Sequence, residues 1–276
     1  MKNSKEKYFI SLFSKNSKHI GDDGAVIGKW VYTQDAFFEN VHFKKEWLSL
    51  KQIANKAMLI NISDAIAMNA VPKYALLSVA IPKSYSKKDL KKISKGFLKC
   101  AKKYNISIIG GDTISNEKLD ISITLISKTK NPIYRSGAKV GDLMAYSGSL
   151  GSVREDLLKL FDGKTIDKNS KFIKPRLRDG FFYEASKYIN SSLDISDGLF
   201  FELERISKAS NIGYEFVDGF DSKIACSGEE YELLFSFEEK NLELIEKIAK
   251  KHNVKINIFA KAIKGSFKNT CKEHHF

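Results

Sequence analysis

Aspartates beside Gly, Ser or Thr recur along this chain, most of them at expected strand ends. Six carboxylates could hold a metal ion if the fold brings them together: Asp23, Asp35, Asp64, Asp112, Asp194 and Asp197. Without a cation they would repel, because two unit charges about 4 Å apart cost about 4 kcal/mol at an effective dielectric of 20. All-oxygen ligands favour Mg²⁺ or Mn²⁺, and Mg²⁺ completes its shell with waters and substrate phosphates. The pattern favours phosphate chemistry, although any single Gly-Asp pair is more often just a turn.

Asp64 is the unusual member, because it lies in the apolar stretch 58–68, MLINISDAIAM. An unpaired ionised carboxylate there would be strongly disfavoured, so this side chain must meet a cation or Lys56, or cap a helix. The spacing leaves two alternatives for Lys56. It pairs with Asp64, or it only covers the apolar face.

Common nucleotide and hydrolase motifs are absent. The segment 24–29 is one residue too short for a P-loop, and the glycines at 148 and 151 are too close for a dinucleotide fingerprint. There is no HRD and DFG pair of a protein kinase, no serine nucleophile elbow and no HExxH zinc motif. A phosphotransferase with this sequence belongs to a less common type.

The chain has 276 residues and a formal net charge of +13, yet only five of its 46 basic residues are Arg. Arg reads bases and phosphates through its planar fork, and the Lys residues are scattered without interleaved aromatics. An RNA-binding module is therefore the weaker alternative, and salt-dependent retention of RNA would be needed to revive it. No apolar run approaches the ~18 residues of a membrane helix. We expect neither nucleic acid nor membrane as a partner.

The cysteines bear on the compartment. Cys100, Cys226 and Cys271 are odd in number and far apart, with no CxxC pair. This spacing argues against a disulfide framework or a thiolate zinc site, and the N-terminus lacks a signal-peptide pattern. We therefore expect a protein of the reducing cytoplasm.

Strands and helices alternate in both halves, which predicts an α/β plus α+β protein of two domains. The first half is expected to hold four strands and two helices: strands 25–33, 74–81, 105–109 and 119–127, a buried helix at 49–70, and an amphipathic helix that begins after Ser86. The second half repeats the alternation: strands 143–147, 231–237 and 254–260, and helices 153–161, 178–189, 199–210 and 242–251. The linker at 128–141 suggests an N-terminal α/β domain over 1–135 and a C-terminal α+β domain over 136–276.

Seven ordered segments resemble motifs of the thiamine-monophosphate kinase family, within the aminoimidazole ribonucleotide synthetase-like superfamily. They are GDDGAVI (21–27), QDAFFENVHF (34–43), KAMLINISDAIAMNAVP (56–72), GGDT (110–113), RSGAKVGDLMAYSG (135–148), LDISDGL (193–199) and SGEEYELLF (227–235). The resemblance implies ATP-dependent phosphorylation of thiamine monophosphate to thiamine diphosphate, with several Mg²⁺ ions. It also implies a homodimer whose N-terminal sheets form a shared barrel.

The resemblance further implies roles for individual residues. The metal ligands would be the six aspartates, with Thr33 and Gln34 adding oxygens beside Asp35. The nucleotide-binding residues would be Gly111, Asp112, Arg135 and Ser196. His42 and Glu229 match substrate-contacting positions. No acid or base is assigned, because the attacking phosphate, with a second pKa near 6, is already largely ionised.

Other interpretations remain open from the residues alone. His42 could be an ordinary strand-end histidine, Glu229 a solvated turn residue, and Arg135 a surface ion-pair partner worth under ~1 kcal/mol. A metal-dependent phosphohydrolase would use the same carboxylates to activate water. The C-terminal end is Lys-Glu-His-His-Phe, so Glu273 stands where the family tends to have an aromatic residue that stacks on the substrate.

Overall fold

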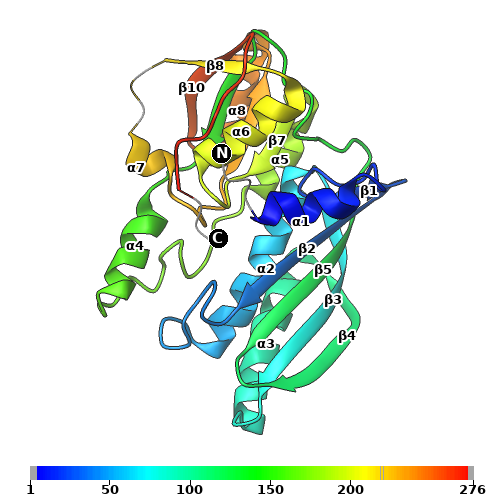
Figure 1. Cartoon of the computed structure of the whole chain (residues 1–276), viewed down its shortest axis with the longest axis vertical. Coiled ribbons are helices and arrows are strands. Elements are labelled where there is room, and N and C mark those ends of the chain that lie inside the picture. The colour runs from blue at the N-terminus through cyan, green and yellow to red at the C-terminus, as the bar shows by residue number, and fades with distance from the viewer. Residues whose placement is uncertain (1–4, 218, 220, 273–276) are drawn as a thin grey trace.

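The computed structural model describes residues 5–217, 219 and 221–272, and it contains two five-stranded sheets, one from each half of the chain (Figure 1). The first sheet has the order β1-β2-β5-β3-β4. Its strands are β1 (Ala25–Ile27), β2 (Trp30–Phe38), β3 (Val71–Pro82), β4 (Ser107–Asn116) and β5 (Asp120–Lys128). Only the β3–β4 pair is parallel. In this order β4 lies at one edge of the sheet.

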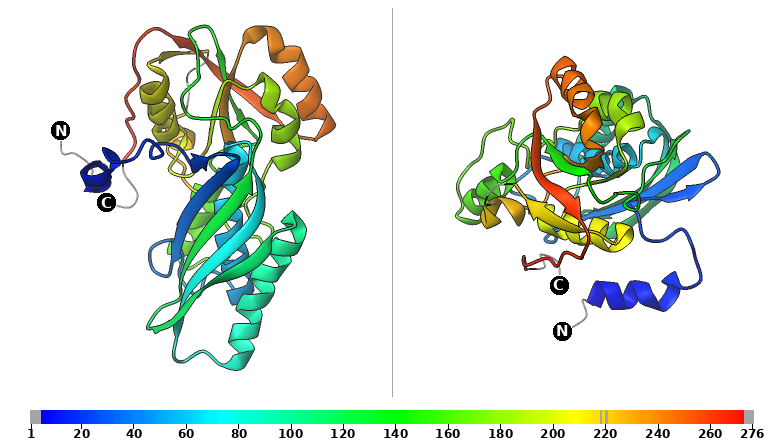
Figure 2. Two further views of the ribbon diagram at one scale, coloured as in Figure 1. Left: turned by 90° about the vertical axis from the view of Figure 1, so that its right-hand side faces the viewer. Right: turned by 90° about the horizontal axis from the view of Figure 1, so that it is seen from above.

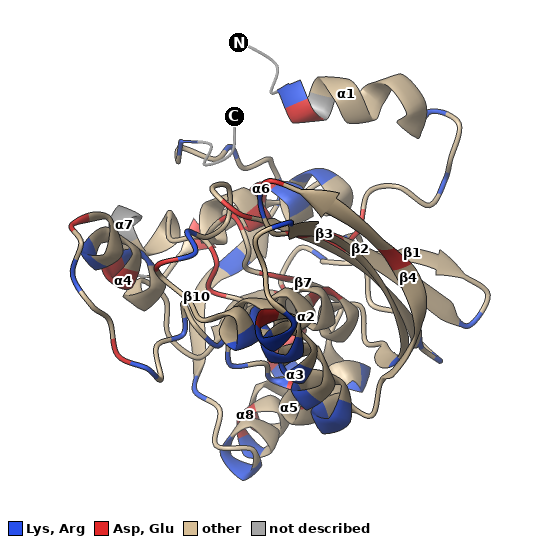
Figure 3. Ribbon diagram, turned by 90° about the horizontal axis from the view of Figure 1, so that it is seen from below, with Lys and Arg blue, Asp and Glu red and all other residues tan. Residues whose placement is uncertain are grey.

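Two long helices belong to this sheet, α2 (Leu50–Ala67) and α3 (Lys87–Tyr104). Both begin with a capping box, formed by Ser49 with Gln52 and by Ser86 with Asp89, which satisfies backbone N–H groups at each N-terminus. The basic residues of α3 lie on its outer side, as Figure 3 shows. By contrast, α2 is buried along most of its length, as its apolar sequence predicts.

The second sheet is antiparallel throughout, in the order β7-β9-β6-β10-β8. Its strands are β6 (Leu143–Ser147), β7 (Ser191–Asp194), β8 (Gly213–Phe216), β9 (Leu233–Phe237) and β10 (Ile256–Ile263). The helices of this half are α4 (Ser152–Phe161), α5 (Asp179–Ala185), α6 (Leu199–Ser210), α7 (Ser222–Ala225) and α8 (Leu242–Lys251), with short 3₁₀ turns at Ser186–Tyr188 and Glu239–Asn241. The two sheets lie on either side of the expected 135/136 boundary, and this mixed α/β architecture confirms the expected class.

The helix α2 joins the two halves. It packs on β2 and β5 of the first sheet and also on β7 and α5 of the second half. The main hydrophobic core is accordingly continuous, from Phe37 and Phe43 to Phe235 and Phe237. Groups carried by α2 can therefore act together with groups from both sheets.

Several element boundaries differ from expectation. The single strand expected over 25–33 is divided into β1 and β2, and β2 continues to Phe38. The strand expected to stop at Ile109 continues to Asn116. The two glycines at 110 and 111 suggested an end, but the strand passes through them beside Leu77. Helix α1 (Lys5–Ser14), which stands apart from the body in Figure 2, and the four-residue strands β7 and β8 were not predicted.

The expectation about cysteines is wrong in one respect, because Cys226 and Cys271 form a disulfide. The segment after β10 returns to the loop that follows α7, so residues 45 positions apart in sequence come to a Cα–Cα distance of 5.5 Å. Cys100 is free and buried. No helix in the described part of the chain is long and apolar enough to cross a membrane.

Candidate functional site

Three of the predicted carboxylates converge where the two halves meet. Asp23 lies in the turn before β1, Asp64 on α2, and Asp194 at the end of β7, and one oxygen of each lies within 4.8 Å of the others. Asp35 joins them from the inner face of β2, where its carboxyl hydrogen-bonds to that of Asp64. The structure thus brings together four of the six aspartates.

Burial and mutual repulsion dominate the electrostatics of this cluster. Burial, with the charge of Asp23 adding to it, raises the pKa of Asp35 to about 6. The pKa values of Asp64 and Asp194 are raised well above their usual range, first by burial and then by the neighbouring carboxylates. Carboxyl groups whose pKa is raised in this way, here those of Asp35, Asp64 and Asp194, bind protons more readily when no other cation compensates them.

The cluster fits a divalent cation. Among the described residues, Asp23 Oδ2 and Asp194 Oδ2 are buried without a hydrogen-bond partner. Unpaired buried oxygens are costly unless a cation or proton meets them. Because every donor is a carboxylate oxygen, the donor set suits a hard ion such as Mg²⁺.

Arg135 lies at the edge of the cluster and holds the turn that carries Asp23. Its guanidinium donates from Nε to Asp23 Oδ1 at 3.1 Å, and a second nitrogen pairs with the same oxygen. Its backbone N–H donates to Asp22 Oδ1 at 2.6 Å. The pair with Asp23 is largely buried, with exposed side-chain fractions of 19% and 3%. Arg135 is therefore not an ordinary surface ion-pair partner.

The two residues expected to add oxygens beside Asp35 point in opposite directions. Thr33 is buried on the inner face of β2, and its hydroxyl donates to Asn61 Oδ1. Gln34 is exposed on the outer face, where its side-chain amide bonds to Ser122. The side chain of Thr33 therefore lies on the carboxylate side of the sheet and that of Gln34 on the other side.

Asp112 does not join the cluster. On the edge strand β4 it lies opposite Ser78, which pairs with Ser122 of β5, which in turn pairs with Ala36 of β2. Three strand spacings, about 14 Å, therefore separate it from β2. Successive side chains alternate between faces, so Asp112 shares the outer face with Ala36, whereas Asp35 lies on the inner face.

The glycine before Asp112 keeps the edge strand close to its neighbour. Gly111 has a φ of +145°, and a Cβ added there would lie 1.8 Å from the carbonyl oxygen of Leu77. No side chain can be accommodated at this position without moving the backbone. Gly111 and Asp112, the predicted nucleotide-binding pair, therefore both lie on an exposed strand. Gly111 offers only its backbone there, and Asp112 adds one carboxylate.

A cavity of about 810 Å³ opens at the chain segment that directly follows Asp194 of the cluster. His42 and Glu229, the predicted substrate contacts, line it together with Ser196 and Asp197. Much of the remaining wall is formed by aromatic, apolar and disulfide residues, among them Val41, Phe43, Trp47, Leu157, Phe161, Cys226 and Cys271. The basic residues Lys44, Arg154 and Lys272 line it as well. This amphipathic cavity suits a small organic ligand. Glu273 lies outside the described residues.

Four predicted residues of the cavity and its rim have defined partners. His42 Nδ1 accepts a hydrogen bond from the backbone N–H of Phe38 at 3.0 Å. Asp197 pairs with Arg205, and its backbone N–H donates to Glu202 at 3.0 Å. The carbonyl oxygen of Ser196 accepts from the N–H of Glu229 at 2.6 Å. The LDISDGL and SGEEYEL segments are therefore bonded to each other at the cavity wall.

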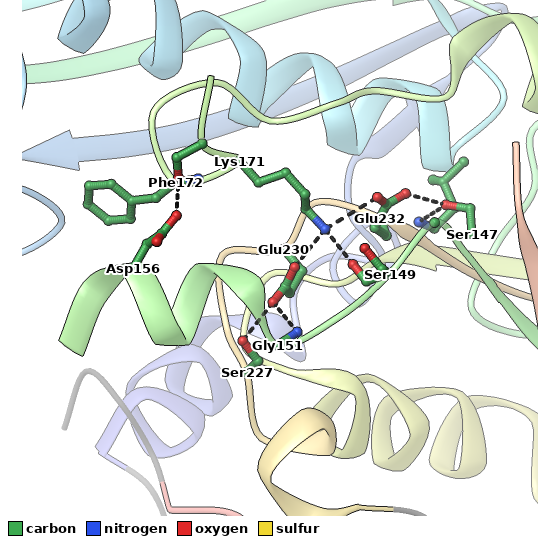
Figure 4. Close-up of polar contacts among 12 residues, drawn as sticks. Ser147, Ser149, Gly151, Asp156, Lys171, Phe172, Ser227, Glu230 and Glu232 are labelled. Atoms are coloured by element: carbon green, nitrogen blue, oxygen red, sulfur yellow. Dashed lines mark hydrogen bonds and ion pairs between the residues drawn. The ribbon is translucent and has the colours of Figure 1, made fainter. Parts of the chain in front are cut away.

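A buried charge network behind this wall was not predicted (Figure 4). Lys171 Nζ lies 2.6 Å from Glu230 Oε2 and 3.3 Å from Glu232 Oε1. Glu230 also accepts from the N–H of Gly151 at 2.6 Å, and Glu232 pairs with Arg178 at 2.8 Å. The three glutamates within residues 229–232 were the available signal, but nothing in the sequence identified their basic partners.

The contact made by Lys56 is neither of the two alternatives that the sequence left open. Its Nζ lies 2.7 Å from Glu229 Oε2, and this is an ion pair across 173 sequence positions. Lys56 therefore does not pair with Asp64. Because Glu229 reaches it from the second half of the chain, the partner was not visible in the local pattern around Asp64.

Known proteins resemble this chain in sequence. Residues 21–129 match the family described as AIR synthase related protein, N-terminal domain. A thiamine-monophosphate kinase of Buchnera aphidicola from Schizaphis graminum is 33% identical over 89% of this chain and 87% of its own length. The thiamine-monophosphate kinase of Pyrococcus horikoshii is 30% identical over 86% and 82%.

The fold is shared with solved structures as well. A structure described as AaThiL complexed with AMPPCP and TMP superposes with a TM-score of 0.83 and 25% identity, over 97% of this chain and 94% of that one. A HypE–HypF complex gives a TM-score of 0.78 at 19% identity, which shows a common fold only. On the sequence identity and coverage of its relatives, this chain belongs to the thiamine-monophosphate kinase family.

Proposed function

We propose that this chain transfers the γ-phosphoryl group of ATP to thiamine monophosphate, which yields thiamine diphosphate and ADP. The observation that carries the proposal is the four-carboxylate cluster beside a cavity large enough for an organic ligand. The relative described as AaThiL complexed with AMPPCP and TMP supports this pair of substrates. This would be the last step in forming the diphosphate.

In this proposal Asp23, Asp35, Asp64 and Asp194 hold several Mg²⁺ ions. When bound, Mg²⁺ supplies charge neutralisation between two anionic phosphates and stabilises the in-line transition state. Thr33 orients Asn61 behind the cluster, and Arg135 fixes the turn of Asp23. Asp197, at the cavity rim, adds a further ligand.

The acceptor lies in the cavity, against His42 and Glu229, with Ser196 and Arg135 toward the nucleotide. Because a phosphate monoester is already largely ionised near neutral pH, no side chain needs to remove a proton from it. Placing two anions in line is the main task of this site. Arg135 contributes a positive charge to it, and the four aspartates would hold the Mg²⁺ that neutralises the phosphates.

We further propose that the site is completed by a second copy of the chain in a homodimer. Among the described strands, β4 has a neighbour only on the β3 side, and its apolar residues Ile109 and Ile114 are 54% and 58% exposed. An unpaired, apolar edge strand favours pairing with another chain. Pairing of the two sheets into a shared barrel would allow Asp112, Gly111 and Gln34 to face the partner's cluster.

The organisation into domains 1–135 and 136–276 and a cytoplasmic location are part of the same proposal. The two sheets on either side of residue 135 support the division into domains. The disulfide weakens the cysteine argument for the cytoplasm, so the proposed location now rests only on the substrates expected for the reaction.

The proposal is tested by measuring ADP release with thiamine monophosphate, with thiamine, and without an acceptor, each with and without Mg²⁺. Mg²⁺-dependent ADP and thiamine diphosphate formation only with thiamine monophosphate is the expected result. Phosphate release without an acceptor would instead indicate a metal-dependent phosphohydrolase. Equal rates with thiamine would contradict a phosphate acceptor.

A further inference from the structure

Lys56 is a completely buried lysine close to the proposed substrate cavity. Its side chain is 0% exposed, and its ammonium group lies 3.9 Å from the ring centroid of Phe172 and 5.5 Å from that of Phe37. Its carboxylate partner is Glu229, at 2.7 Å. A buried ammonium is costly unless it is paired, so this contact is specific.

Glu229 is held in its place by its backbone as well. It has a φ of +55°, which a non-glycine residue adopts only when its surroundings impose it. Its N–H donates to Ser196 at 2.6 Å, and the next residue, Glu230, is anchored to Gly151 and Lys171. These bonds fix the backbone of Glu229 without Lys56. What Lys56 adds is the direction of the carboxylate.

The ion pair also connects the two halves of the chain. Lys56 is on α2, which follows the first sheet's β2, whereas Glu229 lies in the loop before β9 of the second sheet. Glu229 remains 21% exposed and lines the cavity of about 810 Å³. The lysine therefore acts on the cavity from behind its wall, without lining it.

We propose that Lys56 is a positioning residue that fixes the carboxylate of Glu229 for recognition of the acceptor substrate. The pair engages Oε2 of Glu229, which leaves Oε1 for a cationic or hydrogen-bond-donating group of the acceptor. Thiamine monophosphate offers both in its rings and amino group, so the inference rests on the proposed function. It assigns Lys56 to binding of the acceptor and not to the metal cluster beside it.

The test compares steady-state kinetics of K56M, E229Q and the double variant K56M/E229Q. We expect K56M to raise KM for thiamine monophosphate about 10- to 100-fold, as a misplaced contact does, with KM for ATP changed less than about twofold. Because Lys56 acts through Glu229, the double variant should have nearly the same KM as E229Q. The exposed Lys51, on the same helix, supplies the control variant K51M, which should be unchanged.

Two outcomes would overturn the inference. One is a K56M enzyme whose KM for thiamine monophosphate is unchanged, or is raised equally for ATP. The other is a double variant whose effect is the product of the two single effects, since independent action predicts multiplication. If K56M does not fold, the single variants E229Q and K56R are compared instead. K56R keeps the positive charge, so its KM for thiamine monophosphate should rise less than that of E229Q. Wild-type protein that forms no thiamine diphosphate would refute the proposed function instead.

Discussion

Asp35 and Asp112 lie on opposite faces of the same sheet, three strands apart. Asp35 faces inward to Asp64, whereas Asp112 faces outward from the edge strand β4. Both are metal ligands in the proposed function, yet one chain cannot direct both at the same ion. The geometry is consistent if Asp112 serves the cluster of a second copy.

Mixing two inactive variants tests this arrangement. We expect D64N and D112N each to lower turnover by about 100-fold or more, because each removes charge that positions the phosphates. In a mixed dimer, one site would carry both changes and the other would carry neither. Random exchange of subunits makes half of the dimers mixed, so a mixture should recover about a quarter of the wild-type rate.

The control is a mixture of D64N with D35N, whose defects lie in the same cluster and cannot be separated between two sites. That mixture should stay inactive. Recovery in the control, or no recovery in the D64N and D112N mixture when exchange is verified by mass, would contradict a site shared between subunits.

The carboxylate cluster should also limit stability when no metal is bound. Asp64 is half-buried beside three other acidic groups, and its pKa is raised well above the usual range by burial and by Asp35. Replacing it by Asn removes one buried acid, so D64N should be more stable than wild type by about 1 kcal/mol in EDTA. Mg²⁺ should raise Tm for wild type and have little effect on D64N. Exposed D112N provides the comparison and should match wild type in EDTA.

The sequence predicted those parts of the fold that depend on local patterns. Ser49 and Ser86 were recognisable as helix starts from the residues around them, and α6 and α8 begin and end where the periodicity places them. Periodicity says less about β7, because four residues are too few to establish an alternation. The two glycines before Asp112 suggested the end of a strand, but the pairing with β3 continues through them. At Gly111 a side chain would collide with the backbone of Leu77, which accounts for the glycine.

The candidate site divides in the same way. Asp64 stood out because a carboxylate in an apolar helix needs a cation, and it does lie in the cluster. The partner of Lys56 could not be predicted, since Glu229 is 173 positions away and no local pattern links them. The face on which the side chain of Gln34 lies depends on the register of β2 with its neighbouring strand. A slip of one residue in that register would move every side chain of the strand to the other face.

The disulfide leads to a prediction that thiol counting can check. Denatured, unreduced protein should show one reactive thiol, Cys100, and reduction should raise the count to three. In the folded protein Cys100 should not react at pH 8, because burial raises the pKa of its thiol to about 12 and leaves almost no thiolate. Two or more thiols in unreduced, denatured protein would contradict the Cys226–Cys271 bond.

The same shift sets a pH dependence. The folded thiol of Cys100 keeps its proton above the pH at which the unfolded thiol, whose ordinary pKa is 9.0, loses it. The native state therefore binds more protons, and its stability should fall as pH rises from about 9 toward about 12. Because tyrosines titrate in that range too, the measurement is the difference between wild type and C100A by urea unfolding. That difference should change with pH above 9 and stay constant below it.

The buried network behind the cavity should be a main source of stability in the second half. Lys171 is 7% exposed and faces Glu230 and Glu232, both with 0% exposed side chains. Removing its ammonium in K171M leaves two carboxylates with one cation, Arg178, so we expect a loss of about 3–5 kcal/mol in urea unfolding. In K171M/E230Q the unpaired charge is gone as well, and part of the loss should be regained.

The control is K164M, which breaks an exposed pair with Asp162 and should change stability by less than about 0.5 kcal/mol. A double variant less stable than K171M would show that Glu230 contributes through its bond to Gly151 more than through its charge.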